Sequence, residues 1–207
     1  MLTKNAIFRL FILMASATLS GCATTADMPK MEQGSSYPGG TVARKGQPLT
    51  LMGEPVLVGA PLPVSTLVDA NTMQTIDLSK ERGKVMLLSI VPSIDTKVCE
   101  AQTHYLGEEG DDLPDTIRRI TISRDTPFAQ KRFAEEAKLT DLQYLSDHRE
   151  GDFGMSTGLM IDNIRLLARS IVIVDREGIV RYIQVVPEIT HLPDMDKAFS
   201  IAKELSR

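Results

Sequence analysis

The pattern of apolar and polar positions predicts many short strands separated by a few amphipathic helices. Residues 85–91 are apolar except for Ser89, and residues 170–175 repeat that texture before a turn at 176–178. Continuous apolar runs of this length are typical of strands buried on both faces. Shorter runs predict a hairpin over 48–58 that turns at 52–54, two extended segments within 65–78 that turn at Asn71, and strands at 116–123, 142–145 and 179–186.

Three stretches have helical character. They are residues 99–106, residues 127–138 with Pro127 in the first turn, and residues 194–205, whose apolar positions share one side. Early and middle βα units make parallel neighbours, whereas the hairpin near the C-terminus adds antiparallel ones. We therefore expect an α/β domain with a mixed central sheet flanked by helices. A thioredoxin-like fold fits this order, although the pattern alone does not select it.

The first 21 residues are typical of a bacterial secretion signal. Lys4 and Arg9 precede an apolar run at about 10–17, which is too short to cross a bilayer as a helix. The ending Leu-Ser-Gly-Cys resembles a lipobox, in which Cys22 is acylated and becomes the first residue of the mature protein. Ala23 after it is typical of sorting to an outer membrane. We expect a lipid-anchored envelope protein that faces the periplasm; the alternatives are an ordinary signal peptide and an uncleaved anchor.

Residues 22–47 are rich in Gly, Ser, Pro and Thr and show no apolar period. This composition predicts a flexible, lipidated tether, with a partly ordered extension as the alternative. The folded domain is then expected at 48–207, enough residues for a single core.

Charge and cysteine content narrow the possible functions. The formal net charge is −4, and the two basic residues of the leader have no acidic counterpart there, so the mature chain is more acidic still. Nothing in this balance predicts a nucleic-acid partner. The chain has two cysteines, so acylation of Cys22 leaves Cys99 as a lone thiol without an internal disulfide partner. Such a thiol is either buried and inert, or exposed and used in a chemical reaction.

Cys99 lies where the strand at 85–91 gives way to a helix. Unpaired backbone N–H groups at a helix start stabilise a thiolate, which is the reactive form of cysteine. Thr96 precedes Cys99 by three residues, so its hydroxyl can approach the sulfur, and Pro92 bends the chain and can shield it from water. The spacing favours a reactive thiol over a buried structural cysteine.

Three ordered motifs carry a family resemblance. The string PSIDTKVC at 92–99 resembles the active-site loop of the thiol peroxidase subfamily of peroxiredoxins. The string SRDTPFAQKRF at 123–133 is similar to a second signature of that subfamily, with Thr126 where leucine is usual. The string LLARSIVIVD at 166–175 resembles the segment that carries the active-site arginine, here Arg169. The resemblance covers about residues 48–206 and implies a thioredoxin-like, peroxiredoxin-type fold with an N-terminal hairpin.

The resemblance also implies a mechanism. Cys99 would attack the terminal oxygen of a hydroperoxide and become a sulfenic acid. Thr96 would orient the thiolate and the peroxide, Arg169 would stabilise charge as the O–O bond breaks, and Pro92 would limit access of water. No cofactor or metal is implied, and the family often forms homodimers.

One position departs from the family pattern. A resolving cysteine usually follows the Arg-Phe pair of the second motif, but Ala134 stands there. We therefore expect an external thiol to reduce Cys99 sulfenate: a small thiol, a thioredoxin-like protein or a second copy of the chain.

The expected function is reduction of hydrogen peroxide and organic or lipid hydroperoxides. The alternatives are a peroxide sensor or binding lipoprotein without turnover, and a structural lipoprotein with an inert thiol. The three histidines are scattered and do not predict a metal site, and the acidic run at 108–112 is typical of a solvated loop.

Overall fold

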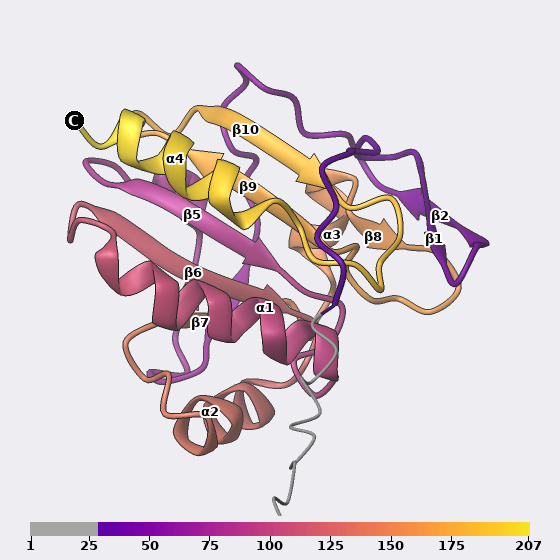
Figure 1. The fold of residues 1–207 in the computed structure, drawn as a ribbon, viewed down its shortest axis with the longest axis horizontal. Coiled ribbons are helices and arrows are strands. Elements are labelled where there is room, and N and C mark those ends of the chain that lie inside the picture. The colour runs from indigo at the N-terminus through magenta and orange to yellow at the C-terminus, as the bar shows by residue number, and fades with distance from the viewer. Residues whose placement is uncertain (1–28) are drawn as a thin grey trace, which may run out of the picture.

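The computed structural model describes residues 29–207 (Figure 1). The predicted signal peptide at 1–21 and the predicted lipidation site Cys22 lie outside these residues. Within residues 29–207, no helix is long and apolar enough to cross a membrane.

A mixed seven-stranded sheet forms the centre of the domain, in the order β10-β9-β5-β6-β7-β3-β4. Strands β5, β6 and β7 are parallel, whereas β9, β10, β3 and β4 each join antiparallel neighbours. The bounds are Leu67–Asp69 (β3), Thr75–Ile76 (β4), Val85–Ile90 (β5), Ile117–Ser123 (β6), Gln143–Ser146 (β7), Ser170–Val174 (β9) and Val180–Val185 (β10). The strands predicted for these regions are confirmed. All residues of β5 and β9 are buried, as their continuous apolar runs predicted.

The helices α1 (Lys97–Glu108), α2 (Pro127–Glu136) and α4 (Met195–Leu205) confirm the three predicted helical stretches (Figure 1). All three pack against one face of the sheet. Alternate residues of β5 separate the two sides: Leu87 lies in the core beneath these helices, whereas Leu88 lies in the core on the opposite face. The mixed sheet with flanking helices confirms the expected fold class.

The N-terminal hairpin differs from the prediction. It consists of β1 (Thr41–Arg44) and β2 (Gln47–Met52), and Lys45 and Gly46 form its turn with φ of 51° and 76°. Two left-handed residues in a two-residue loop suit the twist of an antiparallel pair. Gly53, the centre of the predicted turn, follows the end of β2 and is not part of a hairpin turn. A Cβ there would lie 2.1 Å from the Met155 carbonyl oxygen, so the glycine permits a close backbone approach.

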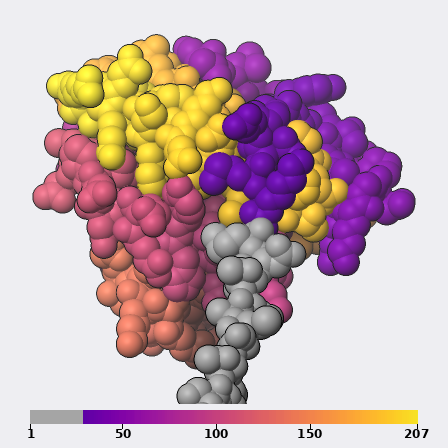
Figure 2. All heavy atoms as spheres, in the orientation of Figure 1, coloured from indigo at the N-terminus to yellow at the C-terminus, as the bar shows by residue number. Residues whose placement is uncertain are grey.

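The prediction of a flexible tether is wrong for residues 29–47, which form an ordered strap. Besides β1, this segment makes isolated bridges that pair Met31 with Leu192 and Ser36 with Val185. The buried amide of Gln184 donates to the carbonyls of Glu32 (2.7 Å) and Gly34 (3.0 Å). Figure 2 shows this segment in indigo against the C-terminal part of the chain in yellow. Tertiary hydrogen bonds hold a segment whose composition is typical of a linker.

Several short elements were not predicted. They are the helix α3 (Asp152–Thr157), the strand β8 (Met160–Ile161), and the 3-10 turns η1 (Leu78–Lys80) and η2 (Glu109–Asp112). Strand β8 pairs with β2, so that β1, β2 and β8 form a second small sheet. Each of these elements is too short to carry a recognisable period.

Candidate active site

Cys99 lies at the third position of α1, after the N-cap residue Thr96. The strand β5 brings the chain to this point, and the loop that follows Ile90 leads into the helix. The first N–H groups of a helix have no partner within it, so the Cys99 side chain lies at the positive end of α1. Its side chain is fully buried in the described structure.

Two side chains donate hydrogen bonds to the sulfur. The Thr96 hydroxyl lies 3.0 Å from Cys99 Sγ, and Arg169 Nη2 lies 3.3 Å from it. Arg169 lies directly before β9 and is only 2% exposed. No carboxylate in residues 29–207 forms a salt bridge with Arg169. A buried cation without an anionic partner is costly, so the Cys99 sulfur is one of the few acceptors that the guanidinium of Arg169 contacts.

Gln102 is a site residue that the sequence analysis missed. It lies one helical turn after Cys99 and is fully buried. Its Oε1 accepts from Arg169 Nη1 at 2.7 Å, and its Nε2 donates to Ser89 Oγ at 2.8 Å. The spacing of three residues along the helix was the available signal, since it places both side chains on one face. Gln102 therefore orients the guanidinium that contacts the sulfur.

A small cavity opens beside the sulfur, with a volume of about 230 Å³. Its walls are mainly apolar and include Pro92, Val98, Ile164, Leu166 and Ile189. Polar groups also line it: Thr96, Arg169, Thr190, Lys97, Ser93 and, from the strap, Arg44. The structure thus brings all four predicted site residues, Pro92, Thr96, Cys99 and Arg169, to one cavity.

The loop before α1 is held by Asp125, a residue of the second sequence motif. Its carboxylate accepts from Ser93 Oγ at 2.9 Å, Ile94 N at 2.7 Å and Ser123 Oγ at 2.7 Å. Charged acceptors of backbone and hydroxyl groups make strong, directional bonds. Asp125 therefore fixes the backbone immediately before Thr96.

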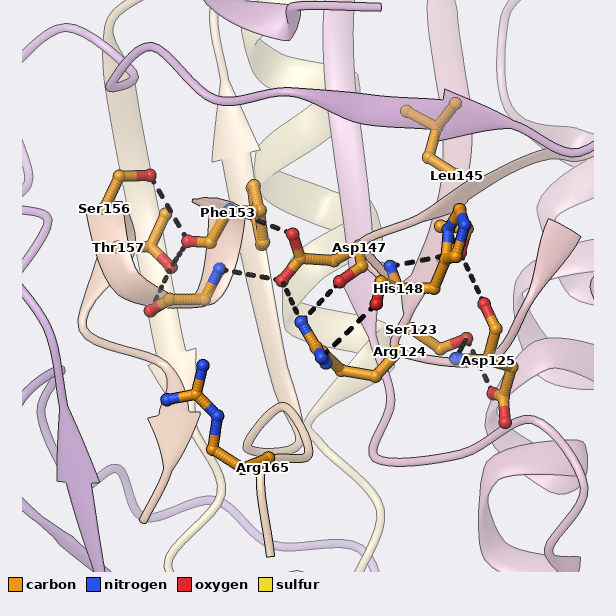
Figure 3. A network of polar contacts seen from close by, with 12 residues as sticks. Ser123, Arg124, Asp125, Leu145, Asp147, His148, Phe153, Ser156, Thr157 and Arg165 are labelled. Atoms are coloured by element: carbon orange, nitrogen blue, oxygen red, sulfur yellow. Dashed lines mark hydrogen bonds and ion pairs between the residues drawn. The ribbon is translucent and has the colours of Figure 1, made fainter. Parts of the chain in front are cut away.

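A second carboxylate, Asp147, is buried and lies close to Asp125 (Figure 3). It accepts from Phe153 N at 3.0 Å and Gly154 N at 3.1 Å, while Arg124 donates to the Asp147 carbonyl at 2.6 Å. Burial raises the pKa of Asp147 to about 6, although the two backbone hydrogen bonds and Arg124 oppose that shift. Asp147 ties α3 to the end of β7, and it does not reach the cavity beside Cys99.

Ala134 is buried in the core on the α2 side of the sheet. Within residues 29–207, Cys99 is the sole cysteine. The histidines lie apart from the sulfur: His104 contacts Glu108, His148 contacts Ser146, and His191 contacts Glu32.

Comparison with known proteins decides the family. The Redoxin family model matches residues 57–199. A thiol peroxidase of Halalkalibacterium halodurans is 43% identical over 163 residues, which cover 79% of this chain and 97% of that protein. A thiol peroxidase of Bacillus subtilis is 42% identical over 161 residues, or 78% and 95% of the two chains. The chain belongs to the thiol peroxidases of the redoxin family.

Solved structures agree with this assignment. The crystal structure of a peroxiredoxin-like protein from Aquifex aeolicus matches with a TM-score of 0.76 and 35% identity, covering 82% of this chain and 99% of that one. A thiol peroxidase from Chromobacterium violaceum matches with a TM-score of 0.72 at 21% identity, over 80% and 96% of the two chains, and supports the fold. This thiol peroxidase is therefore an oxidoreductase that acts on peroxide, with a thioredoxin-like, peroxiredoxin-type fold.

Proposed function

We propose that Cys99 is the peroxidatic residue and that the enzyme reduces hydrogen peroxide and organic hydroperoxides. The Cys99 thiolate attacks the terminal oxygen and the O–O bond breaks. The leaving oxygen departs as hydroxide from hydrogen peroxide, or as an alkoxide from an organic hydroperoxide, and takes a proton to become water or an alcohol. Cys99 is left as a sulfenic acid. The observation that carries the proposal is the pair of donors, Thr96 and Arg169, on one sulfur at the start of a helix.

The same donors suit the transition state. Negative charge moves from the sulfur to the peroxide oxygens as the S–O bond forms, and fixed donors beside that path stabilise it. Arg169 holds its position through Gln102 and through the Ile189 carbonyl, which accepts from Nε at 2.8 Å. A forked guanidinium with two anchored arms loses little entropy when the third arm binds the reacting atoms.

An organic substituent on the peroxide is supported by the cavity. Pro92, Val98, Ile164 and Leu166 present apolar groups beside the sulfur, and Ile164 is 42% exposed at the surface. Apolar walls gain free energy when they bury a hydrocarbon group. We expect cumene hydroperoxide, which carries such a group, to react at least as fast as hydrogen peroxide.

We infer that the cycle is completed by thiols from outside the chain. Ala134 stands at the position where the resemblance implies a resolving cysteine, and residues 29–207 offer no second thiol. One external thiol would attack the sulfenic acid and release water, and a second would release Cys99 from the mixed disulfide. A dithiol reductase or a small thiol supplies both electrons.

We propose that this chemistry takes place at a membrane, as the predicted leader and Cys22 suggest. A lipid anchor on Cys22 would hold the domain at the periplasmic side of the envelope. We propose that peroxidised lipids are then within reach of the enzyme. Labelling with radioactive palmitate, compared between the full chain and its Cys22→Ala variant, tests the anchor; equal labelling would refute it.

The decisive test is rapid mixing of a protein that begins at residue 29 with either peroxide in the absence of reductant. Sulfenic acid on Cys99 is detected by mass after trapping, with Cys99→Ser as the blank. Oxidation much faster than that of free cysteine supports the proposal, and oxidation at the free-cysteine rate refutes it. Fast oxidation that no added thiol or thioredoxin-like protein reverses would instead favour a peroxide sensor.

A further inference from the structure

Glu188 joins two segments that both form the wall of the Cys99 cavity. Its Oε1 accepts from Lys45 N at 2.9 Å and its Oε2 from Gly46 N at 3.0 Å, at the tip of the β1–β2 hairpin. The same carboxylate accepts from Thr190 Oγ1 at 2.7 Å and Thr190 N at 3.3 Å. One side chain thus receives four hydrogen bonds from residues about 145 positions apart in the sequence.

The hairpin turn is built to present these donors. Lys45 and Gly46 both have left-handed backbone conformations, and their N–H groups point to one carboxylate. A non-glycine residue in this conformation is uncommon and is maintained only where surrounding contacts favour it. The adjacent backbones pair as well: Ala43 N donates to Pro187 O at 2.6 Å, and Ile189 N donates to Ala43 O at 2.9 Å.

This clamp lies next to the groups that act on the sulfur. The residue after Glu188 is Ile189, whose carbonyl accepts from Arg169 Nε at 2.8 Å. On the other side of the clamp, Arg44 precedes the hairpin turn and lines the cavity, as do Ile189 and Thr190. Glu188 therefore fixes the carbonyl that anchors Arg169 relative to the hairpin that closes the cavity.

We propose that Glu188 is a positioning residue for peroxide reduction. It fixes the position of the Ile189 carbonyl, which accepts from Arg169, relative to Arg44 in the cavity wall. It does not itself contact the sulfur. This proposal rests on the proposed function of Cys99. It also assigns a catalytic purpose to the ordered strap: Arg44 contributes to the cavity wall, and Glu188 holds the hairpin that carries it.

The ionised form of Glu188 suits this role. Partial burial opposes ionisation, but the hydrogen bonds from Gly46, Thr190 and Lys45 outweigh it and lower the pKa of Glu188 to about 2. Glu188 therefore stays ionised, with both oxygens as hydrogen-bond acceptors, over the whole pH range in which a thiol peroxidase is assayed. A glutamine in its place has one carbonyl oxygen, so it can keep only part of the clamp.

The test compares Glu188→Ala and Glu188→Gln with a matched control, Asp175→Ala. Asp175 also accepts backbone N–H groups of a tight turn, from Glu177 at 3.0 Å and Ile179 at 2.9 Å, but it lies after β9, at the opposite end of the strand from Arg169. Each variant is measured by rapid mixing with hydrogen peroxide and cumene hydroperoxide. Alkylation of Cys99 by iodoacetamide reports thiol reactivity that does not require an oriented peroxide.

We expect Glu188→Ala to slow peroxide oxidation of Cys99 by about 10- to 100-fold, the usual cost of misplacing a catalytic group by about 1 Å. The effect should be larger for cumene hydroperoxide, which contacts the cavity wall, and alkylation should change far less. Glu188→Gln should fall between that variant and the wild type. Asp175→Ala should lower the thermal stability and leave the oxidation rates unchanged.

Three results would overturn the proposal. They are wild-type oxidation rates in folded Glu188→Ala, an equal loss of rate in Asp175→Ala, and a parallel loss of alkylation and oxidation. If Glu188→Ala does not fold, wild-type rates in Glu188→Gln overturn it in the same way. A wild-type protein whose Cys99 oxidises no faster than free cysteine refutes the proposed function itself, and this proposal falls with it.

Discussion

Replacement of Gln102 by glutamate is the sharpest probe of how this site holds its charge. The side chains have nearly the same shape, so Gln102→Glu keeps the acceptor that Arg169 Nη1 contacts at 2.7 Å. It adds a negative charge inside a fully buried cluster. Arg169 would then be shared between a carboxylate and the Cys99 thiolate, and the two anions would repel each other.

The size of the effect follows from the helix geometry. Side chains three residues apart on a helix lie about 5–6 Å from each other. Two like charges at about 6 Å repel by roughly 2–3 kcal/mol at an effective dielectric constant of about 20. That energy corresponds to about a 30- to 150-fold smaller thiolate population under conditions where the thiolate is the minor form. Protonation of the new carboxyl group would reduce the effect, so this is an upper range.

The assay is alkylation of Cys99 by iodoacetamide between pH 5 and pH 8, followed by peroxide oxidation under the same conditions. We expect both rates to fall wherever the new carboxyl group is ionised, and the loss to shrink at the acidic end as that group takes up a proton. Gln130→Glu is the matched control, because Gln130 is also fully buried but bonds to Ser123 and Leu145 on the α2 side. Unchanged rates in Gln102→Glu, or an equal loss in Gln130→Glu, would refute the reasoning.

Three further predictions concern separate parts of the molecule. Thr96→Val should slow oxidation of Cys99 by about 10- to 100-fold, since a hydrogen bond to a charged group contributes about 1.5–3 kcal/mol, and Thr96→Ser should restore most of the rate in the same stopped-flow assay. For a protein that begins at residue 48, urea should give a free energy of unfolding at least about 3 kcal/mol lower than for one that begins at residue 29. The shorter protein lacks the buried Val42 and the hydrogen bonds from Lys45 and Gly46 to Glu188. Equal midpoints and slopes would contradict this. Asp147 should favour folding less as the pH rises from about 4 to about 6, because its raised pKa makes the native state bind more protons than the unfolded state in that range. Its contribution to the free energy of unfolding changes by about 2–3 kcal/mol. Urea unfolding should therefore show Asp147→Asn gaining stability relative to the wild type across that window, and parallel pH profiles would count against the assignment.

The local parts of this structure could be predicted from the sequence because their causes are local. The buried strands β5 and β9 show themselves as continuous apolar runs, and α2 begins at a proline that can occupy only a first turn. The contact between Thr96 and Cys99 is of the same kind, since three residues at a helix start bring a hydroxyl to a thiol.

The contact between Arg169 and Cys99 could not be predicted from local sequence. It lies 70 residues from Cys99 in the sequence, and only the pairing of β9 with β5 brings it to the start of α1. The family motif identified Arg169, whereas its own neighbourhood in the sequence reads as a surface arginine before a strand. Gln102 had a helical spacing that pointed to it, but the partner that gives it a role is Arg169.

The ordered conformation of the strap depends on tertiary contacts alone. Residues 29–47 have the composition of a linker, and nothing in their order indicates the partners that satisfy their backbone. Those partners are Gln184, Glu188 and the backbone at 185–192, about 150 residues away. Short-range propensity cannot register hydrogen bonds that form only after the sheet has assembled. The sequence therefore determined the longer strands and helices and the position of Cys99 at a helix start, while the folded chain decided which polar groups surround that thiol and which segment lies against its cavity.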